Sequence, residues 1–277
     1  MPVLTPSAVR ALLADHDLAP SRALGQHFLA DPNTARRIVR LANVNPGARV
    51  LEIGPGIGSL TVALAEAGAR VLALELDRHL VPALEASVAG VGDVTVVVDD
   101  ALRFDVDRLG TDPWVCVSNL PYNVATPIVI RLLEEAPQIT RFVVMVQREV
   151  GERLAAPPGV RAAGAVSVKV AYYAEARIIG EVPPTVFVPP PNVDSVLVGL
   201  DRLAAPPVSV PSPEELFRLV RAGFAQRRKM LRGALRPLLG EATEAMLVGA
   251  GLAPTARAET LNLADWATLT REVHAAR

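Results

Sequence analysis

From Arg49 onward, short runs of apolar, largely β-branched residues alternate with segments of helical period. The apolar runs are ARVLEIG, RVLALEL, VTVVVDD, WVCVSNL and RFVVMVQ, and the helical segments between them are GSLTVALAEAG, HLVPALEASVAG and TPIVIRLLEEA. Continuous apolar strands separated by amphipathic helices are typical of a parallel sheet that is covered on both faces. The pattern therefore predicts an α/β, doubly wound sheet.

Three later segments of alternating polarity, AVSVKVAYY, ARIIGEV and SVLVGLDR, predict antiparallel strands at one edge of that sheet. A proline-rich stretch over residues 204–212 follows, and it predicts a linker. Beyond it, Ser212 precedes PEELFRLV as a helix cap, and the rest of the chain is helical in period. We expect an N-terminal arm over 1–20 that orders on ligand binding, an α/β domain over 21–203, and a helical domain over 213–277.

Composition supports a folded chain, because 51% of its 277 residues are hydrophobic and only 21% are charged. No apolar run approaches the roughly 18 residues needed to span a bilayer, and Asp15 and Asp17 stand where a signal peptide is apolar. We expect a soluble, cytoplasmic, monomeric protein without membrane contact. The single cysteine, Cys116, excludes an intrachain disulfide and a multi-cysteine metal site, and we expect no metal.

The formal net charge of −1 argues against coating nucleic acid through bulk charge. The charges are nevertheless unevenly placed: residues 64–112 hold ten acidic residues and four arginines, whereas residues 216–240 hold seven basic residues and no acidic one. A solvated helix face and a nucleic-acid contact both explain such a basic run.

A glycine-rich turn ends the first predicted strand in LEIGPGIGSLT, where Gly54, Gly56 and Gly58 let the backbone approach a ligand closely. The spacing G-x-G-x-G differs from the G-x-G-x-x-G of dinucleotide folds. A tight turn without a ligand remains an alternative at this point.

Two acids mark the next strand ends on the same edge of the sheet. Glu75 ends the second strand, where an acid accepts from ribose hydroxyls, and Asp100 follows the third, where a carboxylate accepts from an adenine amine. Each alone could be a solvated acid. Together they outline an adenosine, and because no cation is placed for a pyrophosphate, they favour S-adenosylmethionine over a dinucleotide.

The fourth strand ends in SNLPYNV, a turn that fits methyl transfer to an adenine amine. Pro121 stiffens the turn, so that the Asn119 oxygen and a carbonyl near Leu120 can accept from the amine and aim its lone pair at a methyl group. Tyr122 would stack on a flipped base. A purely structural strand end is the alternative for so short a motif.

Seven motifs in order resemble the ribosomal small-subunit RNA adenine dimethyltransferases of the KsgA type. They are GQHFLAD, LEIGPGIGSLT, LELDR, DDAL, SNLPYNVATPI, VFVPPPNVDS and FAQRRKMLRGAL, and the resemblance runs from about residue 20 to the end. It implies that 21–203 is a Rossmann-like methyltransferase domain and that 213–277 docks ribosomal RNA. The implied reaction is dimethylation of N6 on two adjacent adenosines in the 3′-terminal hairpin of 16S RNA within a late 30S assembly particle. S-adenosylmethionine is the implied methyl donor, and S-adenosylhomocysteine is the product.

The resemblance also implies roles for individual residues. His27 and Leu29 flank the methionine part of the cofactor, Gly54 lies against it, and Asn119 sits between cofactor and target. Tyr122 and Phe187 sandwich the target adenine, although Phe187 could instead be a core aromatic. The phosphate-binding residues are Arg227, Arg228, Lys229, Arg232 and Arg236. The family commonly has Asn at the position of His27, so this chain lacks the amide side chain there.

Three other functions compete with this interpretation. The sibling enzymes that methylate large-subunit RNA and confer macrolide resistance share the catalytic motifs, and only the RNA-docking half separates them from the small-subunit enzymes. A non-catalytic assembly or transcription factor is disfavoured by the intact set of Glu75, Asp100 and Asn119. A dinucleotide oxidoreductase is disfavoured by the glycine spacing.

Overall fold

A computed structural model describes residues 3–21, 25–226 and 228–276. The contacts between Cα atoms divide the chain into two compact units, the first formed by 1–151 and 177–202 and the second by 152–176 and 203–277. The expected domains placed 152–176 with the sheet, whereas these residues group with the helical unit. No helix among the described residues is both long and apolar enough to cross a membrane.

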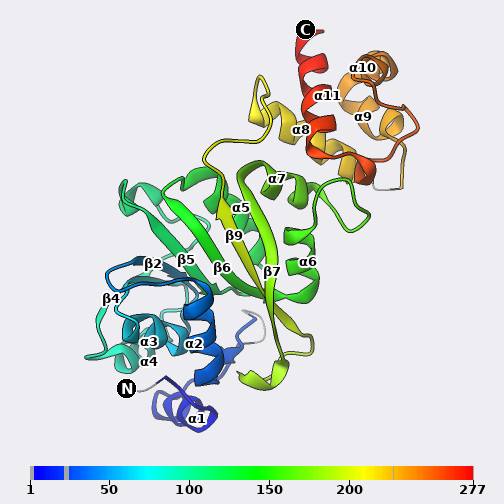
Figure 1. The fold of residues 1–277 in the computed structure, drawn as a ribbon. Helices are drawn as coiled ribbons and strands as arrows, with labels where there is room; N and C mark the ends of the chain where they lie inside the picture. Colours follow the sequence, from blue (N-terminus) through cyan, green and yellow to red (C-terminus); the bar gives the residue numbers. More distant parts are fainter. Residues whose placement is uncertain (1–2, 22–24, 227, 277) are drawn as a thin grey trace. The chain divides into compact units, whose positions relative to one another are not determined.

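A seven-stranded sheet in the order β4-β3-β2-β5-β6-β9-β7 is the centre of the first unit (Figure 1). Its strands are β2 (Arg49–Ile53), β3 (Arg70–Glu75), β4 (Asp93–Val98), β5 (Trp114–Asn119), β6 (Ile139–Gln147), β7 (Ala174–Val182) and β9 (Ser195–Arg202). Strands β2 to β6 pair in parallel, and β9 pairs antiparallel with β6. The prediction of a doubly wound sheet with an antiparallel edge is confirmed.

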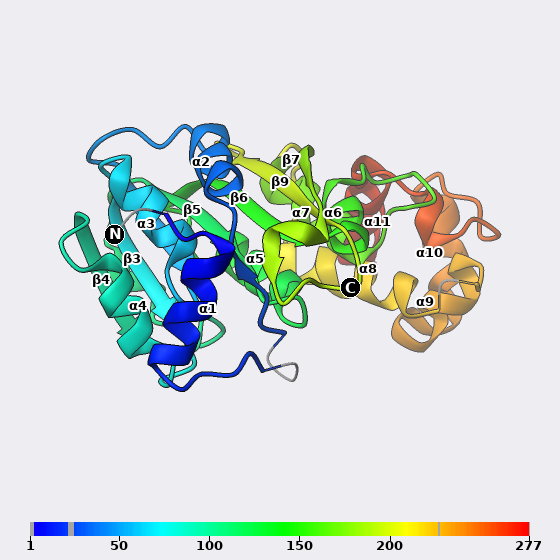
Figure 2. The ribbon, with the colours of Figure 1, turned by 90° about the horizontal axis from the view of Figure 1, so that it is seen from below.

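The helices of this unit are α1 (Pro6–Asp15), α2 (Pro32–Leu41), α3 (Ser59–Glu66), α4 (Val81–Val88), α5 (Ala125–Glu135) and the start of α6 (Arg148–Ala155). Helices α2 and α5 lie on opposite faces of β6 (Figure 2). This explains why every residue from Phe142 to Val146 is fully buried. On one face, Val143 and Met145 pack in a core with Ile38 of α2 and Leu64 of α3.

Residues 3–15 are part of this folded unit. Helix α1 is capped by the Thr5 hydroxyl and buries Val9, Leu12 and Leu13, which cluster with Phe28 and with residues of the glycine turn and α4. The expected arm is therefore a packed helix over Pro6–Asp15.

A second, two-stranded sheet connects segments far apart in the sequence. Strand β1 (Phe28–Leu29) pairs antiparallel with β8 (Phe187–Val188), and Leu29 lies opposite Phe187. Because side chains alternate across a strand, Leu29 and Phe187 enter the core under α2, whereas Phe28 and Val188 face the α1 cluster.

The second unit is helical, and it includes one segment that the sequence misassigned. Its helices are the end of α6, α7 (Ala165–Tyr173), α8 (Pro213–Ala225), α9 (Leu231–Leu239), α10 (Thr243–Gly249) and α11 (Leu263–Ala275). The segment AVSVKVAYY is helix α7 and not a strand. Val168 and Tyr172, four residues apart, enter the core with Leu216 and Phe217 of α8, so tertiary packing overrides the β-propensity of the valines.

The predicted linker and helix start are present. Residues 203–212 contain no helix or strand, and the Ser212 hydroxyl accepts from the backbone N–H of Glu215 at 3.1 Å, which caps α8. The one described cysteine, Cys116, is buried in β5.

Candidate active site

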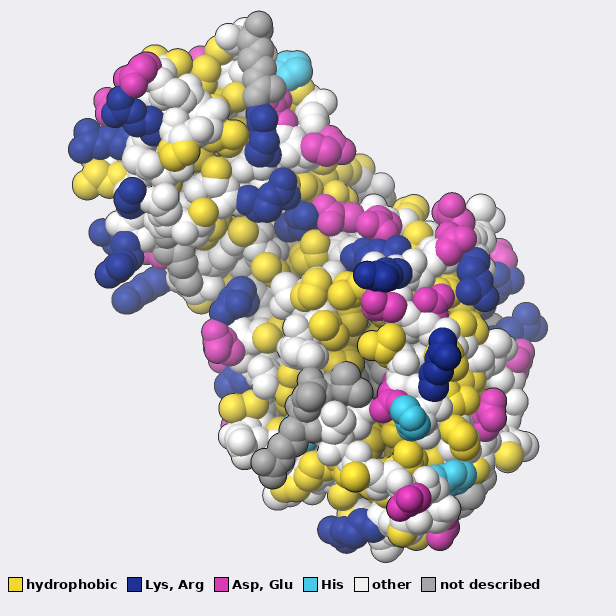
Figure 3. Space-filling model, turned by 180° about the vertical axis from the view of Figure 1, so that it is seen from behind, with side chains coloured by type: hydrophobic (Ala, Val, Ile, Leu, Met, Phe, Trp, Pro, Cys, Tyr) yellow, Lys and Arg dark blue, Asp and Glu magenta, His cyan; other side chains and the backbone are white. Residues whose placement is uncertain are grey.

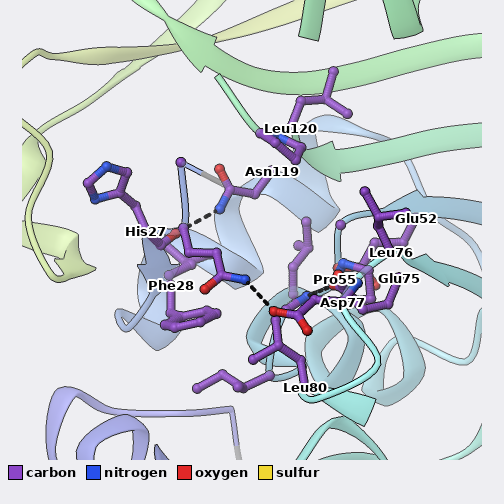
Figure 4. A pocket seen from close by; sticks show the side chains of 18 of the residues that line it. His27, Phe28, Glu52, Pro55, Glu75, Leu76, Asp77, Leu80, Asn119 and Leu120 are labelled. Atoms are coloured by element: carbon purple, nitrogen blue, oxygen red, sulfur yellow. Dashed lines mark hydrogen bonds between the residues drawn. The ribbon is translucent and has the colours of Figure 1, made fainter. Parts of the chain in front are cut away.

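A cavity lies at the carboxyl ends of β2, β3 and β5, where open α/β sheets bind ligands. Its lining comes from four segments: residues 25–29, the glycine turn from Glu52 to Leu60, the end of β3 from Glu75 to Leu80, and the turn from Asn119 to Val124. These are four of the motifs that the sequence singled out. In Figure 4, His27 and Asn119 lie on one side of the cavity, and Glu52, Glu75 and Leu76 lie on the other.

The glycine turn is held by left-handed backbone and by close packing. Gly54 has φ +66°, and a Cβ on it would lie 3.2 Å from the Cδ of Pro121. Gly56 has φ +61°, and a Cβ there would lie 3.0 Å from the ring of Phe28. Only glycine combines these conformations with so little space. The two glycines thus bring the turn against both Pro121 and Phe28.

Glu75 joins the glycine turn to the end of β3. Its Oε2 accepts from the backbone N–H of Gly56 at 2.9 Å, and its Oε1 accepts from the N–H of Asp77 at 2.9 Å. Burial raises the pKa of Glu75, and the two backbone donors oppose that rise. Each carboxylate oxygen has a second lone pair, so a ligand hydroxyl can still donate to this side chain.

Asp77 is tied to the segment before β1. The Gln26 Nε2 donates to its Oδ2 at 3.0 Å. Partial burial acts to raise the pKa of Asp77, but hydrogen bonds from Gln26 and His79 outweigh it and the pKa is lowered. Between these residues and Glu75, the side chain of Leu76 is 59% exposed although it is apolar. An exposed leucine in a cavity wall suits a flat aromatic ligand.

Glu52 is the most deeply buried acid of the cavity, at 1% exposure. Burial raises its pKa to about 8, the charge of Glu75 adds to the rise, and the Thr61 hydroxyl opposes it. Its Oε2 has no hydrogen-bond partner among the described residues. A buried carboxyl with one unpartnered oxygen at the wall of a cavity is an acceptor site for a cationic or N–H group of a ligand.

Asn119 is oriented by the backbone of the segment opposite. Its Nδ2 donates to the carbonyl oxygen of His27 at 3.2 Å, which leaves Oδ1 as an acceptor. Leu120 is buried, and its N–H donates to Met145 of β6. The N–H of Val124 donates to the carbonyl of Pro121 and closes the turn.

Tyr122 is fixed through its hydroxyl, which lies 2.7 Å from the Ser195 Oγ at the start of β9. Burial raises the pKa of Tyr122, and the bond to Ser195 opposes the rise. One face of the Tyr122 ring stacks on the His27 imidazole, with ring centroids 5.5 Å apart and planes inclined by 27°.

The structure brings most of the predicted cofactor residues together, but not all. His27, Leu29, Gly54, Glu75 and Asn119 line one cavity with Leu120 and Tyr122. Asp100 is not among the described residues that line it. Its Oδ1 accepts from the N–H of Leu102 at 2.9 Å and its Oδ2 lies 3.8 Å from Arg103 Nε.

Phe187 does not stand where a base-stacking residue was expected. It is 2% exposed, packs in the core with Leu29 and Ile38, and is not among the described residues of the cavity. Its position opposite Leu29 in the β1–β8 ladder turns the ring away from solvent. The alternative of a core aromatic is the one that the structure shows.

Sequence reasoning did not single out several cavity residues, among them Glu52, Gln26, Leu76 and Asp77. Glu52 carried a signal, because an acid inside the apolar run ARVLEIG is costly to bury without a ligand or partner. Gln26, Leu76 and Asp77 lie within the motifs GQHFLAD and LELDR, but their individual roles depend on which segments meet at the cavity.

Four of the five predicted phosphate-binding residues are described, and they lie in the second unit. The fifth, Arg227, lies outside the described residues. Arg228 and Lys229 are exposed, whereas Arg232 pairs with Glu244 at 3.5 Å and Arg236 pairs with Glu241 at 2.5 Å. Both pairs are exposed, so exchanging the carboxylate for a phosphate costs about 0–1 kcal/mol.

A sheet with this strand order, a glycine turn after β2 and an acid at the end of β3 is typical of the class of S-adenosylmethionine-dependent methyltransferases. Within that class, the chain belongs to the ribosomal RNA adenine dimethylase family, whose model matches residues 20–275. The resemblance seen in the motifs is thereby confirmed.

Individual relatives match nearly the whole chain. The ribosomal RNA small subunit methyltransferase A of Thermobifida fusca is 48% identical over 274 residues, covering 96% of this chain and 95% of the relative. Its namesake in Streptomyces coelicolor is 46% identical, with 96% of each chain covered. Among solved structures, the 23S rRNA methyltransferase ErmE has a TM-score of 0.68 and 27% identity, covering 89% of this chain and 99% of ErmE.

Proposed function

We propose that this protein dimethylates N6 of two adjacent adenosines in the 3′-terminal hairpin of small-subunit ribosomal RNA. The observation that carries the chemistry is the Asn119 amide, whose Nδ2 is bonded to His27 so that Oδ1 is left as an acceptor in the cavity. The substrate follows from likeness: identity is 48% over nearly the whole chain to a small-subunit enzyme and 27% to ErmE.

The cavity residues fit S-adenosylmethionine. Glu75 would take the ribose hydroxyls, and Leu76 would cover a face of the adenine. The unpartnered Oε2 of Glu52 supports a role in accepting from the ammonium group of the methionine part. Asp100, at the neighbouring strand end, remains the proposed partner of the adenine amine. When bound, the cofactor supplies a methyl group on a sulfonium.

The turn at the end of β5 prepares the target amine. An exocyclic adenine amine is a poor nucleophile because its lone pair is delocalised into the ring. Asn119 Oδ1 and the carbonyl near Leu120 would accept its two N–H groups and favour the pyramidal form. Because the attacking nitrogen is already neutral, this arrangement needs no strong general base, and the proton leaves to solvent after transfer.

The second unit would bind ribosomal RNA through phosphates. In Figure 3, Lys and Arg side chains gather along one margin of the second unit, whereas those of the first unit are mixed with acidic side chains. Arg228 and Lys229 are exposed, and Arg232 and Arg236 can exchange their surface partners. Such contacts give affinity that falls with salt and little base specificity. We further propose that the protein acts as a monomer in the cytoplasm, on a 30S assembly particle, and that it needs no metal.

Methylation assays with two substrates test this proposal. The protein is incubated with labelled S-adenosylmethionine and either unmethylated 30S particles or naked large-subunit RNA. We expect label in the 30S particle alone. Label confined to large-subunit RNA would assign the chain to the macrolide-resistance type instead, and absence of label in both would favour a non-catalytic assembly factor.

A further inference from the structure

Arg131 joins helix α5 to the turn that carries Asp100. Its Nη1 donates to the carbonyl oxygen of Ala101 at 2.8 Å, and its Nη2 donates to that of Phe104 at 2.8 Å. Its Nε pairs with the Glu135 Oε2 on the same helix at 2.8 Å, and the Arg131 side chain is only 16% exposed. Because the guanidinium is planar and each of its three nitrogens has a partner, its position against the turn is defined.

The turn from Asp100 to Phe104 is also closed by bonds of its own. The N–H groups of Arg103 and Phe104 both donate to the Asp100 carbonyl at 2.7 Å. The Asp100 Oδ1 accepts from the N–H of Leu102 at 2.9 Å, as in the Asx turns that fix a short side chain against the backbone. The direction of the Asp100 carboxylate therefore depends on the conformation of this turn, which the guanidinium holds from outside.

The contacts of Arg131 connect the two halves of the proposed site. Helix α5 begins at Ala125, directly after the turn from Asn119 to Val124 that is proposed to prepare the target amine. In the other half, the N–H of Asp99 donates to the carbonyl of Glu75 at 3.1 Å and ties the end of β4 to the end of β3. Arg131 thus spans from the helix behind the methyl-transfer turn to the strand end of the adenine half.

We infer that Arg131 is a positioning residue for the adenine end of the cofactor, because it holds the turn in which Asp100 accepts from the 6-amino group. This inference rests on the proposed function, which makes Asp100 that acceptor. Without the guanidinium, the carbonyls of Ala101 and Phe104, two buried residues, lose charged donors, and the turn must rearrange to satisfy them. Arg131 is not among the described residues of the cavity, so its effect on the cofactor passes through the turn.

Arg202 provides a matched control beside the same helix. Its guanidinium donates at 2.7 to 3.1 Å to four backbone carbonyls, those of Leu132, Leu133, Ala136 and Ile139. None of these carbonyls belongs to the turn that carries Asp100. Removing Arg202 therefore leaves carbonyls near the end of α5 without charged donors and leaves the adenine end as it is.

Two ligands separate the adenine contact from cofactor binding in general. S-adenosylhomocysteine carries the 6-amino group, whereas S-inosylhomocysteine carries an oxygen at that position and offers no N–H there to a carboxylate. Calorimetry with the full-length protein gives the ratio of the two affinities. We expect wild type to prefer the adenosyl ligand about 10- to 100-fold, the value of one hydrogen bond to a charged group. Asp100→Ala should lose this preference.

Arg131→Met keeps the apolar stem of the side chain and removes every donor. We expect its preference to fall below about 3-fold, and that of Arg131→Lys, which keeps one charged donor, to lie between Met and wild type. Arg202→Ala should stay within about 3-fold of the wild-type ratio. Combining Arg131→Met with Asp100→Ala should leave the ratio of Asp100→Ala unchanged, since both changes act on one contact.

Several outcomes overturn the inference. A wild-type ratio in Arg131→Met does so, and if that variant does not fold, a wild-type ratio in Arg131→Lys does. A ratio lost equally in Arg202→Ala would mean that general loosening around α5 is the cause. Wild-type protein that binds both ligands equally overturns the role of Asp100, and wild-type protein that leaves 30S particles unlabelled overturns the proposed function. Both of these results are obtained without any Arg131 variant.

Discussion

At the scale of single residues, the site consists of polar side chains that are oriented by hydrogen bonds to the backbone. These bonds decide which of their atoms remain available to a ligand. Asn119 shows this most clearly, because the bond from its Nδ2 to the His27 carbonyl decides which end of the amide faces a ligand. The strand end and the residue type could be read from the sequence. The orientation could not, since it depends on a residue 92 positions away.

Replacing Asn119 with alanine tests its role as the acceptor for the target amine. We expect kcat with 30S particles to fall about 10²- to 10³-fold, the range for losing one preorganised polar group. Cofactor affinity, measured by calorimetry, should stay within a few fold, because other residues hold most of the cofactor. Retained turnover would show that another group orients the amine.

The raised pKa of Glu52 predicts that the stability of the protein depends on pH. Its pKa is about 8 in the folded protein and 4.5 without the fold. The folded state therefore binds the extra proton between these values, and stability falls as the pH rises through this window, by at most about 1.4 kcal/mol per pH unit.

Glu52→Gln should abolish this loss, since glutamine keeps the shape of the protonated acid. Urea unfolding at pH 5 and pH 8 without ligand provides the measurement. We expect the variant to match wild type at pH 5 and to exceed it at pH 8. Parallel pH profiles for the two proteins would mean that Glu52 does not carry the titration.

At the scale of elements, continuous apolar runs were read correctly, and among the alternating runs SVLVGLDR was read correctly as β9 whereas AVSVKVAYY was not. Strands β2 and β6 are largely buried on both faces, so their sequences have one interpretation. The alternation in AVSVKVAYY fitted a strand, yet α7 forms because Val168 and Tyr172 meet the core of the second unit. The prediction that Phe187 stacks on the target base does not hold for a similar reason, since only the β1–β8 pairing reveals which way its ring turns.

Alanine substitutions at two glycines with positive φ distinguish the cost of backbone strain from an effect on the geometry of the site. Gly54 has φ +66° and little space beside Pro121, whereas Gly47 has φ +80° and nothing within 4 Å of a Cβ. Alanine at either position should cost about 1–2 kcal/mol of stability from left-handed backbone.

Only Gly54→Ala should also impair catalysis, because its Cβ would push the Pro121 turn away from the cavity. We expect a loss of about 10- to 100-fold in turnover with 30S particles, and near wild-type turnover for Gly47→Ala. Equal turnover in both variants would show that the contact between Gly54 and Pro121 does not position Asn119.

At the scale of the whole molecule, the net charge of −1 is a sum over unlike parts. The sheet unit carries the acidic segment that includes Glu75, and the helical unit carries Arg228 and Lys229. We expect the protein to bind a structured ribosomal particle well and arbitrary RNA weakly at physiological salt.

Removing two of these charges tests the role of the helical unit. Arg228→Ala with Lys229→Ala should weaken binding to 30S particles and reduce the slope of log affinity against log salt by about 1.5. The matched control, Arg49→Ala with Arg70→Ala, removes two charges at the amino ends of β2 and β3, away from the cavity. An equal change of slope in both double variants would contradict a specific docking surface.

The chemistry and place of methylation together test the central claim most directly. Unmethylated 30S particles are incubated with the protein and S-adenosylmethionine, and the 3′-terminal hairpin of the small-subunit RNA is excised and analysed by mass spectrometry. The account predicts N6,N6-dimethyladenosine at two adjacent positions, absent when Asn119→Ala replaces the wild-type protein. A hairpin without dimethyladenosine, or modification confined to other sites, would contradict it.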